Sequence, residues 1–193
     1  MLSSAPTEAE PPHPTHQLFE QGDRLPPRTD VLWRIERGIV RTLTRNEEGE
    51  LFTSGYWGPG DVVGHALSRV NPYEIYCLTS VKTSVLPSKL WCQLLDKLVL
   101  HHQQLEEMLI ILHQPQTPQK LWQFLIWLAH KFGREVEQGR LIELRITHQE
   151  FAEVISTTRV TVTRTLQLFE SKGMLRRYQK QLIVCAQTQQ TLW

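Results

Sequence analysis

Hydrophobic and polar residues follow two different periods along this chain. Between residues 17 and 87, short apolar runs such as 31–35 are separated by turn-forming pairs such as Gly22-Asp23. Turn signals at intervals of about 8 to 12 residues are typical of a small β-sandwich or barrel. Beyond this region, apolar residues recur every three or four positions, which is the period of helices. We therefore predict a β-domain followed by a largely helical part.

The first helical pattern covers residues 88–114 and carries one continuous stripe. The stripe repeats at heptad spacing and consists of Leu98, His101, Leu105, Met108 and Leu112. Such a stripe is typical of the seam between two helices, although just over two heptads are too short to hold a coiled coil alone. Two interpretations stay open. Either the stripe is a homodimer interface whose histidine fixes the register, or it packs on the β-domain of the same chain.

Residues 115–119, with the sequence PQTPQ, predict a hinge. Two prolines among polar residues end one helix and redirect the chain. The next pattern, residues 121–128, is apolar on nearly all sides and predicts a buried helix. This helix has few basic residues near its tryptophans, which argues against a membrane-surface role. No apolar run approaches the roughly 18 residues of a membrane span.

Residues 146–175 predict two short helices joined by a tight turn. The first opens with a capping box, Thr147-x-x-Glu150, in which each end offers a side chain to an unpaired backbone donor. The second begins near Thr158 and ends at Gly173, a residue that commonly stops helices. The inward faces consist of Phe151, Val154, Ile155, Val162, Leu166 and Phe169. A plain helical hairpin is the alternative, but this combination of cap, turn and exposed arginines favours DNA binding.

The outward face of the second helix predicts direct base reading. It carries Arg159, Val160, Thr163 and Arg164. Arginines at the exposed start of a helix suit bidentate donation to guanine in the major groove. The basic hairpin that follows is a predicted wing whose cations lie on phosphate. The residues expected to contact the DNA backbone are Thr147, His148, Gln149, Thr161, Arg176, Arg177 and Lys180.

The charge distribution agrees with DNA binding at one end of the chain. The net charge is only +1, but residues 115–193 hold 11 Lys and Arg against 6 Asp and Glu. Residues 1–114 hold 10 against 14. A basic C-terminal part beside an acidic N-terminal part attracts a polyanion to one end only.

These motifs resemble the Crp/Fnr family, the cAMP-receptor-protein and FNR regulators. Residues 146–184 are similar to its winged helix-turn-helix. The run 159–164, RVTVTR, looks like that of the NtcA-like nitrogen regulators of cyanobacteria. Segments similar to the family's cyclic-nucleotide-binding-like β-roll are 19–23, 33–38 and 58–64. One departure is Ser156, at a turn position where many helix-turn-helix proteins carry glycine.

The resemblance implies an α+β fold with an N-terminal β-roll, a long dimerisation helix and a C-terminal winged helix-turn-helix. The implied divisions are a disordered tail (1–16), the β-roll (17–87), the dimerisation helix region (88–114), the hinge (115–119) and the winged helix-turn-helix domain (120–193). It also implies a homodimer that binds double-stranded DNA at an inverted repeat and contacts RNA polymerase. Val160 stands where cAMP-receptor-type members carry glutamate, so GTA-type half-sites are expected rather than TGTGA.

The effector site is where this chain differs most from cAMP-binding members. Those members carry Gly-Glu followed by an arginine, whereas this chain has Gly64-His65 and only Arg69, out of place in the pattern. A cyclic nucleotide would lose two charge-assisted contacts of roughly 1.5–3 kcal/mol each, so no useful cAMP binding is expected. Residues 97–114 contain no arginine, which disfavours 2-oxoglutarate. A regulator gated by 2-oxoglutarate or another small ligand in the roll is the alternative.

Cofactors and catalysis are not expected. Cys77, Cys92 and Cys185 are far apart and form no cluster for iron–sulfur sensing, and isolated histidines do not predict a haem or metal site. No nucleophile or acid–base set has catalytic spacing, so the chain is not an enzyme. Residues 1–16 are polar and proline-rich without the apolar core of a secretory signal, and a reduced, cytoplasmic setting fits the scattered cysteines.

Overall fold

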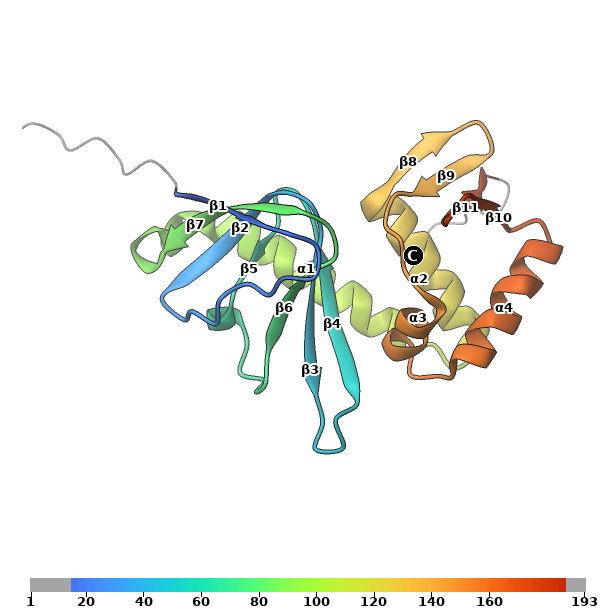
Figure 1. Cartoon of the computed structure of the whole chain (residues 1–193), viewed down its shortest axis with the longest axis horizontal. Coiled ribbons are helices and arrows are strands. Elements are labelled where there is room, and N and C mark those ends of the chain that lie inside the picture. The colour runs from blue at the N-terminus through green and yellow to red at the C-terminus, as the bar shows by residue number, and fades with distance from the viewer. Residues whose placement is uncertain (1–14, 187–193) are drawn as a thin grey trace, which may run out of the picture.

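The computed structural model describes residues 15–186 as two parts connected by one long helix (Figure 1). The N-terminal part is a roll of two antiparallel sheets, and the C-terminal part combines helices with a small sheet. The predicted α+β arrangement of β-roll, long helix and winged helix-turn-helix is therefore confirmed. Most of the expected tail, residues 1–16, lies outside the described residues, but His16 already pairs with Ser84 in a sheet.

The roll is built from short strands whose inward positions are apolar. Its strands are β1 (His16–Phe19), β2 (Val31–Arg37), β3 (Val40–Arg45), β4 (Leu51–Trp57), β5 (Val62–Val63), β6 (Glu74–Cys77) and β7 (Val81–Pro87). One sheet has the order β1-β7-β2-β5 and the other the order β4-β3-β6. The residues packed between the sheets include Trp33, Ile35, Val40, Trp57 and Ile75. A short 3₁₀ helix, η1 (His65–Leu67), follows β5.

The long helix α1 (Leu95–Leu112) follows a 3₁₀ segment, η2 (Ser88–Leu94), and extends from the roll to the C-terminal part (Figure 1). Its heptad stripe faces inward. His101 and Met108 are buried, and the three leucines of the stripe pack against core clusters of the same chain. Strands β4 and β5 and the next helix contact this helix. This packing favours the second interpretation, in which the stripe packs on its own chain, over the dimer interface that the sequence also suggested.

Helix α2 (Thr117–Phe132) begins inside the expected hinge. Pro118 lies in its first turn, where a missing backbone N–H breaks no helical hydrogen bond. The break between the two helices is therefore shorter than the predicted 115–119 segment. The predicted apolar run within α2 is buried, with Leu121, Phe124 and Leu128 fully inaccessible.

The C-terminal part surrounds α2 with two further helices and a four-stranded sheet. Its remaining elements are β8 (Gly133–Val136), β9 (Gly139–Ile142), α3 (His148–Val154), α4 (Arg159–Ser171), β10 (Leu175–Tyr178) and β11 (Gln181–Cys185). The sheet order is β10-β11-β9-β8. The predicted wing, β10–β11, is thus one hairpin of a larger sheet whose β8–β9 hairpin the sequence did not indicate.

The hydrophobic core of the C-terminal part continues into the roll. Tyr56 of β4 is buried in the same cluster as α2, with its ring centroid 5.7 Å from that of Phe124 and 6.5 Å from that of Trp127. Met108 and Ile111 of α1 join the same cluster. The two parts therefore share one core at their junction. In the described part of the chain, no helix combines the length and apolarity that crossing a membrane requires.

Candidate nucleic-acid interface

The first helix of the pair, α3, begins with the capping box that the sequence predicted. The Thr147 hydroxyl accepts a hydrogen bond from the Glu150 backbone N–H at 3.1 Å. The Glu150 carboxylate in turn accepts from the Thr147 backbone N–H at 2.7 Å. Two N–H groups without helical partners are satisfied in this way, which fixes where α3 begins. Phe151 and Ala152 bury the inner face of the helix.

The turn between α3 and α4 depends on a left-handed backbone at Ser156, where φ is +53°. Glycine adopts this conformation more readily than any residue with a Cβ. The turn closes with a hydrogen bond from the Thr157 N–H to the Ala152 carbonyl at 2.9 Å. The serine therefore makes the turn that glycine would make, at some cost in backbone energy.

Helix α4 has distinct start and stop signals. The Thr158 hydroxyl caps its N-terminus by accepting from the Thr161 N–H at 3.1 Å. At the other end Gly173 takes a φ of +70°, and the Met174 N–H donates to the Phe169 carbonyl at 2.9 Å. The Met174 bond and the bond from the Gly173 N–H to the Glu170 carbonyl form a Schellman motif, which satisfies the last carbonyls of the helix. The ring of Phe169 meets Trp122 of α2 edge to face, with centroids 5.3 Å apart.

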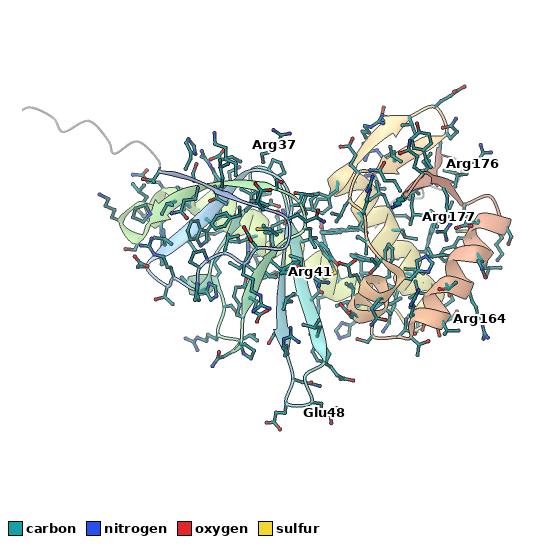
Figure 2. All side chains as sticks on the ribbon, in the orientation of Figure 1. Arg37, Arg41, Glu48, Arg164, Arg176 and Arg177 are labelled. Carbon is teal, nitrogen blue, oxygen red and sulfur yellow. The ribbon has the colours of Figure 1, made fainter. Side chains whose placement is uncertain are left out.

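The outward face of α4 is open to solvent. Val160 is 58% exposed, and Arg159 and Arg164 are exposed as well. Within residues 15–186, neither arginine side chain forms an ion pair or a hydrogen bond. Figure 2 shows Arg164 projecting from α4 at the outer edge of the C-terminal part. Two unpaired guanidinium groups on one exposed helical face are available to a ligand.

Two of the predicted threonine contacts are engaged inside the motif. The Thr163 hydroxyl donates to the Arg159 carbonyl at 2.9 Å and lies 2.8 Å from Nδ1 of His148. Thr161 and Thr158 bring their hydroxyl oxygens to 2.9 Å at the helix N-cap. These hydroxyls position α3 and α4 relative to each other and to their caps. Their predicted contact with DNA stays a prediction.

The wing brings further cations to the same side. Arg176 and Lys180 are exposed, and Figure 2 shows Arg176 and Arg177 beside α4. Arg177 is not free, because its Nε donates to the Glu170 carboxylate of α4 at 2.6 Å. This ion pair attaches the wing to α4. The structure thus places Arg176 and Arg177 of the wing beside the helix that carries Arg164.

Sequence reasoning missed two exposed residues farther along α4. Gln167 lies about one turn after Thr163 and Leu168 about one turn after Arg164, and Leu168 is an exposed apolar side chain. Gln167 follows Thr163 by four residues, so it continues the same helical face. That spacing was the available signal for Gln167.

The residues assigned to an effector lie apart from α4, in the roll. His65 and Arg69 line a cavity of about 620 Å³ together with Arg24, Tyr73 and Glu74. Nε2 of His65 lies 2.8 Å from the Tyr73 carbonyl. Arg24 is paired with Glu74 at 3.1 Å, so Arg69 is the cation of this group without a partner in the described residues. Gly64 is buried and does not line the cavity.

The space between the roll and α1 is filled by stacked rings. The indole of Trp57 and the imidazole of His101 lie parallel with centroids 4.0 Å apart. The Trp57 Nε1–H donates to the Thr42 hydroxyl at 3.0 Å, and Nδ1 of His101 lies 3.0 Å from the Val62 carbonyl. Burial lowers the pKa of His101. Both rings are therefore held by the roll itself.

Comparison with known proteins gives consistent results for both parts. A family described as the Crp-like helix-turn-helix domain matches residues 119–189. The regulatory protein CysR of Synechococcus elongatus is 37% identical over 182 residues, which cover 93% of this chain and 88% of that protein. The global nitrogen regulator of Nostoc sp. is 28% identical over 87% of this chain and 70% of that protein. A CRP-family transcriptional regulator from Thermus thermophilus superposes with a TM-score of 0.74 at 19% identity, over 88% of this chain and 91% of that one.

Proposed function

Because the chain belongs to the Crp/Fnr family of DNA-binding transcriptional regulators, we propose that it acts as a homodimer reading an inverted repeat with GTA-type half-sites. The observation that carries this proposal is the exposed face of α4. It presents Arg159 and Arg164, neither of which has a partner among residues 15–186, together with an exposed Val160. Two such helices related by a two-fold axis would enter successive major grooves about 34 Å apart.

The proposed base reading follows from the chemistry of these side chains. Arginine donates bidentately to O6 and N7 of guanine, and valine contacts the thymine methyl but accepts no hydrogen bond. A half-site with one guanine followed by thymine fits this pair of residues. Arg176 and Lys180 on the wing would add affinity that does not depend on sequence.

The dimer would form through a different face of α1 from the one that the sequence suggested. Side chains at alternating spacings of four and three residues are all exposed on this outward face, namely Leu95, Val99, His102, Glu106 and Leu109. Leu95 is 67% and Leu109 56% exposed, which is unusual for large apolar side chains on one helix. The spacing is that of a coiled-coil seam. A second copy of α1 is the occupant that this seam fits.

The roll supports a regulator that does not need cyclic nucleotide. His65 stands where family members that bind cAMP carry the glutamate that contacts the ribose. The Trp57–His101 stack fills the space beside α1. The alternative, a regulator gated by 2-oxoglutarate or another small anion, is favoured by one observation. The cavity beside His65 contains the unpaired cation Arg69.

The test is fluorescence anisotropy of the purified protein on three duplexes. These are a GTA-N8-TAC palindrome, a TGTGA palindrome and a scrambled duplex, each with and without cAMP or 2-oxoglutarate. We expect selective binding to the first duplex without added ligand. Arg159→Ala should weaken that binding by about 1–3 kcal/mol and leave the scrambled duplex nearly unaffected. Arg37→Ala, which removes an exposed arginine of the roll (Figure 2), is the matched control. Equal losses on all duplexes would contradict base reading by Arg159.

A further inference from the structure

Hydrogen-bond geometry fixes which nitrogen of His148 carries a proton. The Thr163 hydroxyl has one hydrogen and donates it to the Arg159 carbonyl, which can only accept. The same hydroxyl oxygen lies 2.8 Å from Nδ1 of His148. Both contacts are satisfied only if Nδ1–H donates to the threonine. In the neutral ring Nε2 is then without a proton, so Nε2 is the atom that gains or loses one.

The titrating nitrogen belongs to a ring that lines an open groove. His148 is half-buried and lines a groove of about 470 Å³ with Thr147, Gln149 and Arg159. In the described part of the chain, Nε2 of His148 has no hydrogen-bond partner. All four lining residues lie at the start of α3 or α4, beside the exposed face assigned to DNA.

The charges around this ring come from α4 and the wing. Burial lowers the pKa of His148, and the nearby Arg177 and Arg159 guanidinium groups lower it further, whereas Glu170 opposes them. Glu170 is itself paired with Arg177. Before DNA arrives, the cations therefore favour the neutral ring. A phosphate entering the groove would reverse this balance, because an adjacent anion favours the protonated ring.

We propose, on the basis of the proposed DNA binding, that His148 is a proton-dependent phosphate contact whose Nε2–H donates to the DNA backbone only when the imidazole is protonated. Thr163 acts as its positioning residue by holding Nδ1–H. DNA binding then takes up a proton at this histidine. Affinity falls as the pH rises, by at most about tenfold per pH unit for one proton. Because phosphate carries no sequence information, the effect is the same on specific and scrambled duplexes.

The experiment measures the dissociation constant from pH 5.5 to 8.5 at constant ionic strength, for the palindromic and the scrambled duplex. His148→Asn keeps an amide N–H for Thr163 but cannot titrate, so its affinity should depend less on pH than that of the wild type. His130→Gln, an exposed histidine on α2, is the matched control and should keep the wild-type profile. Identical pH profiles for wild type and His148→Asn would overturn the inference.

Two further readouts separate proton linkage from a merely structural role. Salt dependence should become shallower by about 0.9 in the slope of log affinity against log salt from pH 6 to 8, because one phosphate contact is lost. Thr163→Val frees Nδ1 to lose its proton, so neutral His148 can donate through Nε2. This variant should therefore flatten the pH profile on scrambled DNA. An unchanged salt slope would overturn the inference, while absence of binding to any duplex at every pH would overturn the proposed function itself.

Discussion

Arg41 of β3 and Glu153 of α3 form an ion pair across the junction of the roll and the C-terminal part, with Nη1 3.4 Å from Oε2. Arg41 is only 8% exposed, and Figure 2 shows it where the roll approaches α3. The same Nη1 lies 4.0 Å from the carboxylate of Glu150, the residue that completes the capping box. One buried guanidinium thus connects the roll to both acidic residues of α3.

Replacing Arg41 by methionine tests the contribution of this junction to stability. Methionine fills similar space but leaves two carboxylates without their cation, so we expect a loss of about 1–3 kcal/mol in the free energy of unfolding. Urea denaturation measures it. Arg134→Met breaks the exposed pair with Glu143 and should change stability by no more than about 1 kcal/mol. Equal effects of the two substitutions would contradict a special role for the buried pair.

Substitutions at two residues with left-handed backbone, Ser156 and Gly173, should change the free energy of unfolding in opposite directions. Ser156→Gly should raise the free energy of unfolding by about 0.5–1 kcal/mol, because glycine adopts positive φ without steric cost. Gly173→Ala should lower it by about 1 kcal/mol, because its φ of +70° is unfavourable for alanine although the space for a Cβ is open. Thermal unfolding of both variants provides the measurement. A destabilised Ser156→Gly protein would show that the serine side chain stabilises the turn.

Substitutions on the outward and inward faces of α1 should have different effects, one on dimerisation and the other on stability. Leu109→Glu places charge on the outward seam, so sedimentation velocity should show monomers that are still folded. Met108→Ala leaves a cavity in a core where this side chain is 3% exposed, and should cost about 2–5 kcal/mol of unfolding free energy without changing the oligomeric state of the folded protein. A dimer that persists in Leu109→Glu would exclude the outward seam as the interface.

The stacked His101 predicts lower stability in acid. Its folded pKa is lowered by burial and by Lys131, against opposing effects of the Val62 carbonyl and Asp61. The unfolded state, with a pKa of about 6.5, therefore binds a proton more readily. This contribution to stability is complete above that pH and is lost as the pH falls toward the folded pKa. Urea unfolding between pH 5 and 7 should show a smaller pH slope for His101→Asn than for the exposed control His113→Gln.

Val160 predicts a change of base preference. Val160→Glu introduces an acceptor for cytosine, so binding should shift from the GTA palindrome toward the TGTGA palindrome by about 1–3 kcal/mol. Leu168→Glu, on an exposed position two turns later, should weaken both duplexes by a similar factor. Competition anisotropy on the two duplexes provides the comparison. An unchanged ratio for Val160→Glu would place this residue outside base contact.

Local signals predicted local structure well. The capping box, the Gly173 stop and the inward apolar faces of α3 and α4 all depend on residues within a few positions of one another. Such interactions form largely within a segment, so a single sequence contains the information needed to find them. The same reasoning located the exposed arginines of α4.

Long-range features were not predictable in the same way. On α1 the inward stripe and the outward seam both follow heptad spacing, and only the placement of the roll decides which one is covered. The ion pair of Arg41 with Glu153 joins residues 112 positions apart, so the residues around one partner do not indicate where the other lies. The hairpin β8–β9 was missed because the charged segment 134–138 lacks the alternation of apolar and polar residues that indicates a strand.

The position of Tyr56 affects how the molecule can be divided experimentally. Its ring belongs to the roll by sequence but completes the aromatic cluster around Phe124 and Trp127. A fragment cut after the long helix would lack this ring and present the cluster to water. Amide protons of β4 and α2 should therefore exchange with solvent at similar, slow rates, as parts of one cooperative unit. We therefore expect a fragment without the strand that carries Tyr56 to be less stable than the same segment in the whole chain.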